Sequence, residues 1–107
     1  MELRQYTIVL VDLDPTVGSE IKKTRPCVIV SPNEMNKYLN TLVVAPMTTN
    51  LKKYPSRVLV NHNRKKGMVV LDQIRTVDKK RIIKVFDGLN KIEVQNCKKT
   101  IKEIFVD

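Results

Sequence analysis

The stretch TRPCVIVSP at residues 24–32 places a short apolar segment between two prolines. The four residues after Pro26 are all apolar, as is typical of a buried strand. Pro26 fixes its own φ and needs no ladder N–H, so it suits the start of a strand. Because proline disfavours the helical region for the residue before it, we expect Arg25 to be extended. The sequence therefore predicts a strand at 27–31 that begins beside a permanent cation at a sheet edge.

Further strand-like segments, separated by turn residues, occupy most of the chain. With the first they lie at 6–13, 27–31, 41–48, 56–62, 68–77 and 81–89. Asp12 and Asp14, next to Pro15, indicate a turn after the first of them, and NRKKG at 63–67 indicates a basic turn after the fourth. Six short strands with no long helix among them predict a small, strongly bent antiparallel sheet or barrel.

The end of the chain changes from a strand period to a helix period. Apolar residues recur there at intervals of three and four: Val94, Cys97, Ile101, Ile104 and Phe105. This stripe is typical of an amphipathic helix. Asn90 with Glu93 three residues later resembles a capping box at its start. The expected fold class is mainly β, a small barrel closed or flanked by a C-terminal α-helix, in a single domain over residues 1–107.

Composition narrows the class of protein further. Apolar residues make up 42% and charged residues 29%, which favours a globular chain over a disordered one. The longest apolar segments are too short to cross a bilayer, and no export signal opens the chain, so we expect a cytoplasmic protein without a membrane partner. Cys27 and Cys97 have no second Cys or His at metal-ligand spacing, which indicates small core residues in a reducing compartment.

The charge is strongly basic and unevenly distributed. The formal net charge is +9, yet the first twenty residues hold one base and four acids. The remaining residues hold 19 bases and 7 acids, and most of the bases gather in short clusters between the apolar segments. A solvated surface explains such a charge in many small proteins. At this density a polyanionic partner is the more specific interpretation.

Three short segments are candidates for chemistry. Arg25 is a stiffly held cation, although a charge that protects an apolar strand from aggregation has the same pattern. PMTTN at 46–50 offers two hydroxyls and an amide to phosphate oxygens or base edges, or forms an ordinary turn. In DQIR at 72–75, strand alternation puts Gln73 and Arg75 on one face, unless Arg75 makes a structural contact with an aspartate.

Other chemistry has little support in the sequence. The single histidine, His62, stands beside the basic turn and is interpreted as a solvent-facing turn residue. The chain has no metal-ligand cluster, phosphate-binding glycine loop or paired-carboxylate pattern. If the protein is an enzyme, we expect it to work without a metal or cofactor, and without histidine.

Taken in order, these motifs resemble one family. VDLDPTVGSEIKKTRPCVIVSP, VVAPMTTN, YPSRVLV and GMVVLDQIRTVDKKRI, from about residue 9 to residue 83, are similar to the MazF/PemK family of toxin endoribonucleases. The resemblance implies an SH3-like barrel that dimerises, cuts single-stranded RNA at short sequence motifs, and is neutralised by an antitoxin. An acidic antitoxin would suit the basic surface.

The resemblance also assigns roles to residues of this chain. It implies that Arg25 and Thr48 are catalytic. The residues expected in the RNA groove are Ser19, Glu20, Lys23, Thr49, Asn50, Lys53, Gln73 and Arg75. The implied reaction uses the 2′-hydroxyl of RNA as nucleophile and leaves a 2′,3′-cyclic phosphate and a 5′-hydroxyl. An arginine fork suits the charge that develops on phosphorus.

Two other classes of protein have to be weighed against this one. The first is a non-catalytic inhibitor on the same fold, like the CcdB toxins that poison DNA gyrase, which lack the pair represented by Arg25 and Thr48. The second is a passive nucleic-acid-binding barrel. Such modules display stacking aromatic residues, and this chain has only two phenylalanines and three tyrosines. Both alternatives are therefore less favoured than a ribonuclease.

Overall fold

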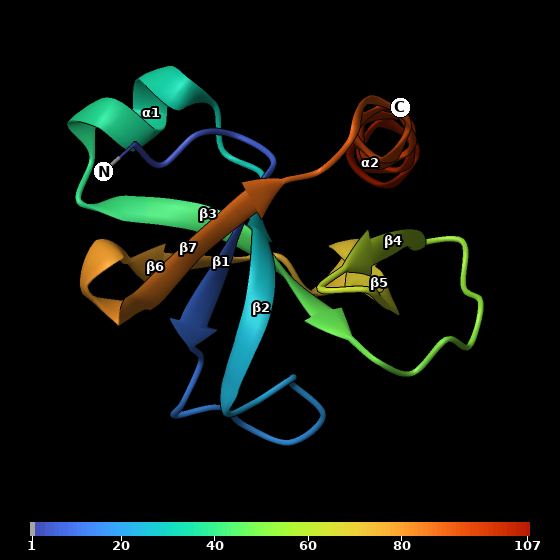
Figure 1. The fold of residues 1–107 in the computed structure, drawn as a ribbon, viewed down its shortest axis with the longest axis horizontal. Coiled ribbons are helices and arrows are strands. Elements are labelled where there is room, and N and C mark those ends of the chain that lie inside the picture. The colour runs from blue at the N-terminus through green and yellow to red at the C-terminus, as the bar shows by residue number, and fades with distance from the viewer. Residues whose placement is uncertain (1) are drawn as a thin grey trace.

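A computed structural model describes residues 2–107 as one curled antiparallel sheet with two α-helices (Figure 1). The strands are β1 (Thr7–Asp12), β2 (Thr24–Ile29), β3 (Thr41–Thr48), β4 (Arg57–His62), β5 (Lys65–Val70), β6 (Arg75–Asp78) and β7 (Ile82–Gly88). The helices are α1 (Asn33–Tyr38) and α2 (Lys91–Phe105). The predicted fold class, mainly β with a C-terminal helix, is confirmed, and the sheet forms a half-barrel.

The sheet is built around β3, which pairs with three other strands. The order is β4-β5-β3-β2-β1-β7, and β6 also pairs with β3. The first half of β3 lies against β6 and its last two residues, Met47 and Thr48, lie against β5. β2 pairs with the middle of β3 on the other side. Because its two halves have different partners, β3 holds the curled ends of the sheet together.

The central strands are buried on both faces, which explains their unbroken apolar composition. One face carries a cluster formed by Val9, Val11, Leu13, Cys27, Ile29, Leu42, Val44 and Val77. The other face packs toward α2 through Ile8, Val28, Ala45, Met47, Val58, Val60, Val69, Leu71 and Cys97. Consecutive residues of β1 and β2 thus belong to different clusters, as strand alternation requires.

Helix α2 begins at the predicted capping box. The Asn90 side chain accepts from the Glu93 backbone N–H, and the Glu93 carboxylate accepts from the Asn90 N–H. The helix lies against β4 and the 3₁₀ turn Leu71–Gln73 (Figure 1). Its stripe is covered only in part, because Ile104 and Phe105 are exposed at 37% and 53%. The predicted amphipathic helix is confirmed, and its apolar stripe is left uncovered at the last turn.

Several predicted boundaries are also wrong. The segment 68–77 is not one strand: β5 ends at Val70, a 3₁₀ turn follows, and β6 begins at Arg75. The sheet consequently has seven strands rather than six. The basic turn is shorter than predicted, because Asn63 and Arg64 alone connect β4 to β5 and both have positive φ. This is the two-residue hairpin geometry that follows the twist of the sheet.

Both cysteines are buried, as predicted, and their thiols are free. Burial raises the pKa of the Cys27 thiol to about 12, against a smaller lowering effect of the Arg75 charge. Burial also raises the pKa of the Cys97 thiol to about 12, and the Glu93 charge adds to this. Both groups therefore stay protonated in the folded chain well above the ordinary thiol pKa of 9.0.

The thiols should consequently be unreactive in the native protein, and they should lower its free energy of unfolding at alkaline pH. At pH 8 we expect neither thiol to react with an aromatic disulfide reagent until urea unfolds the chain, because the thiolate is the nucleophile. Above the ordinary pKa the unfolded chain releases thiol protons that the folded chain retains. The free energy of unfolding should therefore fall as the pH rises from about 9 toward 12. Fast modification of either thiol without urea would contradict the assignment.

Candidate active site

The two candidate catalytic residues line the same cavity, of about 250 Å³. Arg25 comes from β2 and Thr48 from the end of β3, and the β4–β5 hairpin and β7 also contribute to the wall. The lining residues are Arg25, Pro26, Met47, Thr48, Thr49, His62, Asn63, Lys65, Lys66 and Phe86. Their ionisable groups are basic and no carboxylate is among them. This is the charge pattern of an anion site.

Arg25 lies near the start of β2. It pairs with Val11 of β1, whereas β2 pairs with β3 from Cys27 to Ile29, so Arg25 has a strand partner on one side, which agrees with the predicted edge position. The extended conformation before Pro26 is confirmed by its place in the strand. Its Nε donates to the Lys22 carbonyl oxygen at 3.4 Å. Among residues 2–107 no carboxylate lies within ion-pair distance of its guanidinium, which leaves the fork for an external anion.

Thr48 is held by its neighbours at the end of β3. Its Oγ1 accepts from the Asn50 N–H at 3.2 Å. This bond forms the turn that was the alternative interpretation of PMTTN. The backbone pairs with Met68, and a Cβ at Gly67 would lie only 3.3 Å from the Thr48 carbonyl oxygen. The absence of a side chain at Gly67 thus permits this close approach. The Thr48 hydroxyl keeps its own hydrogen to donate.

A second cavity, of about 370 Å³, contains much of the predicted RNA groove. It is lined by Ser19, Glu20, Asp72, Gln73, Ile74 and Arg75. Sequence motifs far apart in the chain therefore meet there. Gln73 lies in a 3₁₀ turn, so the strand alternation predicted for DQIR does not apply to it. Arg75 donates to the Leu13 carbonyl oxygen at 3.0 Å rather than to an aspartate.

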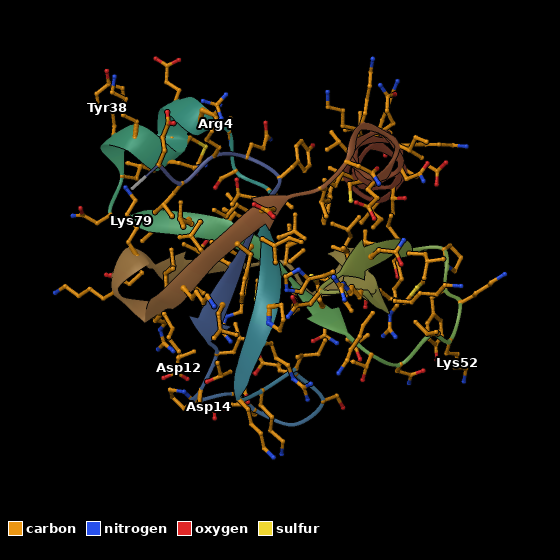
Figure 2. The ribbon with its side chains drawn as sticks, viewed as in Figure 1. Arg4, Asp12, Asp14, Tyr38, Lys52 and Lys79 are labelled. Atoms are coloured by element: carbon orange, nitrogen blue, oxygen red, sulfur yellow. The ribbon has the colours of Figure 1, made fainter. Side chains whose placement is uncertain are left out.

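The loop between β1 and β2 contacts both cavities. The Ile21 N–H donates to the Gln73 side chain at 2.9 Å, while the Lys22 carbonyl accepts from Arg25. The Glu20 carboxylate accepts from the Val17 N–H at 2.7 Å, so Glu20 shapes the loop. The predicted turn at its start is confirmed, because the Asp14 N–H donates to the Asp12 carboxylate. Figure 2 shows both aspartates at this end of the sheet.

The other predicted RNA-binding residues are placed differently. Thr49 lines the first cavity, whereas Lys23, Asn50 and Lys53 line neither of the two. These three are exposed on the loops that flank β2 and follow β3. Lys52, in the same loop as Lys53, lies on the outer loop in Figure 2, with its ammonium 5.4 Å from the centre of the Tyr54 ring. Such lysines supply attraction for a polyanion without a fixed contact.

The sequence prediction missed the aromatic part of the first cavity. His62 is the last residue of β4, half-buried, and contacts Phe86 of β7 with ring centroids 4.7 Å apart and planes at 67°. The interpretation of His62 as a solvent-facing turn residue is therefore wrong. β4 and β7 are opposite ends of the sheet order, and only the curl of the sheet brings the two rings together. Local sequence patterns contain no signal for such a contact.

Residues 2–107 contain no cluster of three or more histidine, cysteine, aspartate or glutamate side chains arranged to hold a metal ion. In the same range, no helix is both long and apolar enough to span a bilayer.

Solved MazF structures share the half-barrel fold of this chain. MazF from Deinococcus radiodurans superposes with a TM-score of 0.86 at 20% identity, over 97% of this chain and 96% of that one. An endoribonuclease from Mycobacterial species, solved with its cognate antitoxin, superposes with a TM-score of 0.80 at 19% identity, over 94% and 92%. At these identities the likeness establishes the fold.

Sequence comparison gives the family. Residues 4–105 match the PemK-like, MazF-like toxins of type II toxin–antitoxin systems. The chain is 37% identical over 104 residues to the endoribonuclease MazF of Staphylococcus epidermidis, covering 89% of this chain and 87% of that protein. The chain therefore belongs to this toxin family, which confirms the resemblance found in its motifs.

Proposed function

We propose that this toxin is an endoribonuclease that cuts single-stranded RNA at short sequence motifs, without a metal ion or cofactor. The observation that carries the proposal is the first cavity, where the unpaired guanidinium of Arg25 shares a cationic wall with the Thr48 hydroxyl. The related MazF of Staphylococcus epidermidis is an endoribonuclease by name. A phosphodiester is the anion that these two facts favour together.

The chemistry needs little more than positioning and charge. The RNA 2′-hydroxyl attacks the adjacent phosphorus and loses its proton as the O2′–P bond forms. The P–O5′ bond breaks and the 5′-oxygen takes up a proton, so the products are a 2′,3′-cyclic phosphate and a 5′-hydroxyl. Arg25 stabilises the extra negative charge through its planar fork, and Thr48 donates to a non-bridging oxygen. Lys65 and Lys66 supply the positive charge that a metal supplies in other nucleases.

The second cavity suits the bases of the RNA segment. Ser19, Gln73 and Arg75 present donors and acceptors for the edges of splayed bases or for the sugar–phosphate backbone. Glu20 keeps the loop in shape, while Thr49 and Asn50 extend the polar surface from Thr48. Lys23 and Lys53 add affinity that depends on salt.

The wider role proposed is that of the toxin in a toxin–antitoxin pair. Residues 1–107 act as one toxin domain in the cytoplasm, and two copies form a homodimer. An acidic segment of the cognate antitoxin neutralises the toxin by occupying the basic groove. The Mycobacterial neighbour solved with its antitoxin supports this pairing.

Cleavage of a mixed RNA pool in excess EDTA is the test of this function. We expect RNA fragments with cyclic-phosphate and 5′-hydroxyl ends, and no cleavage of an all-2′-deoxy pool, because the nucleophile is the 2′-hydroxyl. Sequencing the ends gives the recognised motif. Cleavage of the deoxy pool, or a requirement for Mg²⁺, would contradict the mechanism. Tight RNA binding without cleavage would instead favour a passive binder, and inhibition of DNA gyrase would favour the CcdB-like class.

A further inference from the structure

The first cavity is lined by two chemically different kinds of residue. Arg25, Thr48, Thr49, Lys65 and Lys66 supply cations and hydroxyls. Pro26, Met47, His62 and Phe86 supply apolar and aromatic groups. A phosphate alone would need only the first kind. A nucleotide, which joins a phosphate to a flat apolar base, can use both.

The two aromatic residues of the cavity, His62 and Phe86, are held in place by packing. Phe86 packs against the core cluster that faces α2, so its ring is anchored. The contact between His62 and Phe86 is edge-to-face, which covers the face of only one ring. The Lys84 ammonium lies over the Phe86 ring at 5.1 Å, leaving the imidazole as the less occupied of the two. His62 is half-buried at the cavity wall, where it can accept a stacked base.

We propose that His62, supported by Phe86, stacks on the nucleobase next to the scissile phosphate. The inference rests on the proposed ribonuclease function and assigns a base-stacking subsite to the same cavity. Stacking of a base on an aromatic ring stabilises single-stranded RNA on a protein and aligns the adjoining phosphate. With the base fixed, the phosphate lies against Arg25 and Thr48 in the geometry for in-line attack.

The position of His62 at the hairpin favours this role. The residue precedes a two-residue turn and pairs with Lys65, another residue of the cavity wall. The hairpin thus holds the proposed stacking ring of His62 and the phosphate-attracting ammonium of Lys65 as cross-strand neighbours. Each nucleotide presents these two features, a base and a phosphate, at a fixed spacing along the chain.

The experiment compares an RNA that the wild type cleaves with two abasic versions of it. One version lacks the base on the 5′ side of the cut, and the other lacks the base on the 3′ side. His62→Ala should lower kcat/KM on the order of ten-fold on the complete RNA. On the RNA that lacks the stacked base, His62→Ala and wild type should cleave about equally. His62→Phe, which keeps a ring, should restore most of the rate. Phe86→Leu, which keeps bulk, should lose part of it.

Matched controls separate stacking from other effects. Tyr38→Ala removes an exposed aromatic ring from the end of α1, outside both cavities (Figure 2). It should cleave like wild type. Thermal unfolding of each variant identifies a loss that comes from misfolding, in which case His62→Gln replaces His62→Ala in the same comparison.

Two results would overturn the subsite while the ribonuclease function stands. One is an equal loss by His62→Ala on the complete and on both abasic RNAs. The other is a His62→Phe variant as defective as His62→Ala, which would assign His62 to proton transfer. A wild type that cleaves no RNA would overturn the proposed function itself, and the subsite with it.

Discussion

Replacing Arg25 by alanine should lower the rate of RNA cleavage at saturating RNA by roughly 100- to 1,000-fold, equivalent to about 2.7–4 kcal/mol of barrier. Among residues 2–107 no carboxylate lies within ion-pair distance of the guanidinium, which lines the same cavity as Thr48. It is also only half-buried and makes one long hydrogen bond within the chain, so its removal should leave the fold intact. Single-turnover cleavage measures the first of these two effects, with RNA binding establishing saturation, and thermal unfolding measures the second.

Two variants serve as controls for Arg25→Ala. Arg25→Lys keeps the charge but loses the planar fork, and we expect it to recover only a small part of the rate. Arg4→Ala removes an exposed arginine beside α1 (Figure 2). The Arg4 guanidinium forms a 3.4 Å surface ion pair with Glu2. This variant should cleave like wild type. If Arg25→Ala cleaves within about ten-fold of wild type, the assigned role in transition-state stabilisation is wrong.

Replacing Glu93 by alanine should lower the free energy of unfolding by about 2–4 kcal/mol, the largest stability effect that we predict. Glu93 is buried at 7% exposure. Its carboxylate accepts from the Asn90 N–H at 2.9 Å and from the Asn61 N–H at 2.8 Å. It thereby caps α2 and fastens that helix to β4. The alanine variant leaves both donors without their acceptor, and urea denaturation measures the loss.

Glu103 offers the matched control because it is an exposed glutamate on the same helix. Glu103→Ala should change the free energy of unfolding by less than about 0.5 kcal/mol. Glu93→Gln keeps one acceptor oxygen and should lie between the two alanine variants. A Glu93→Ala variant as stable as Glu103→Ala would show that the cap and its link to β4 contribute little.

Much of the fold was predictable because it depends on local patterns. The capping box at Asn90 and Glu93 locates α2, and the proline after Arg25 dictates an extended backbone. The short helix α1 was missed because it has six residues, follows Pro32 and has no apolar stripe. The 3₁₀ turn Leu71–Gln73 was missed because it is only three residues long and lies between two segments rich in β-branched residues.

The candidate site was predictable only in part, for a physical reason. Arg25 and Thr48 come from motifs that can be read along the chain, and the structure brings both to one cavity. The contact between His62 and Phe86 depends on the curl of the whole sheet, which no local pattern encodes. The distribution of most of the predicted RNA-binding residues over two cavities likewise follows from tertiary packing.

The burial of the central strands on both faces has a consequence for how such an enzyme can be silenced. Arg25 and Thr48 belong to β2 and β3, and we expect the amides of the buried residues of these strands to exchange with solvent only when the whole chain unfolds. Local unfolding of the core of β2 and β3 is then not available as a way to inactivate the site while the rest of the molecule remains folded. Every folded molecule therefore has its candidate active site assembled. Restraint must come from outside, by a molecule that occludes the site or by proteolysis of the entire chain.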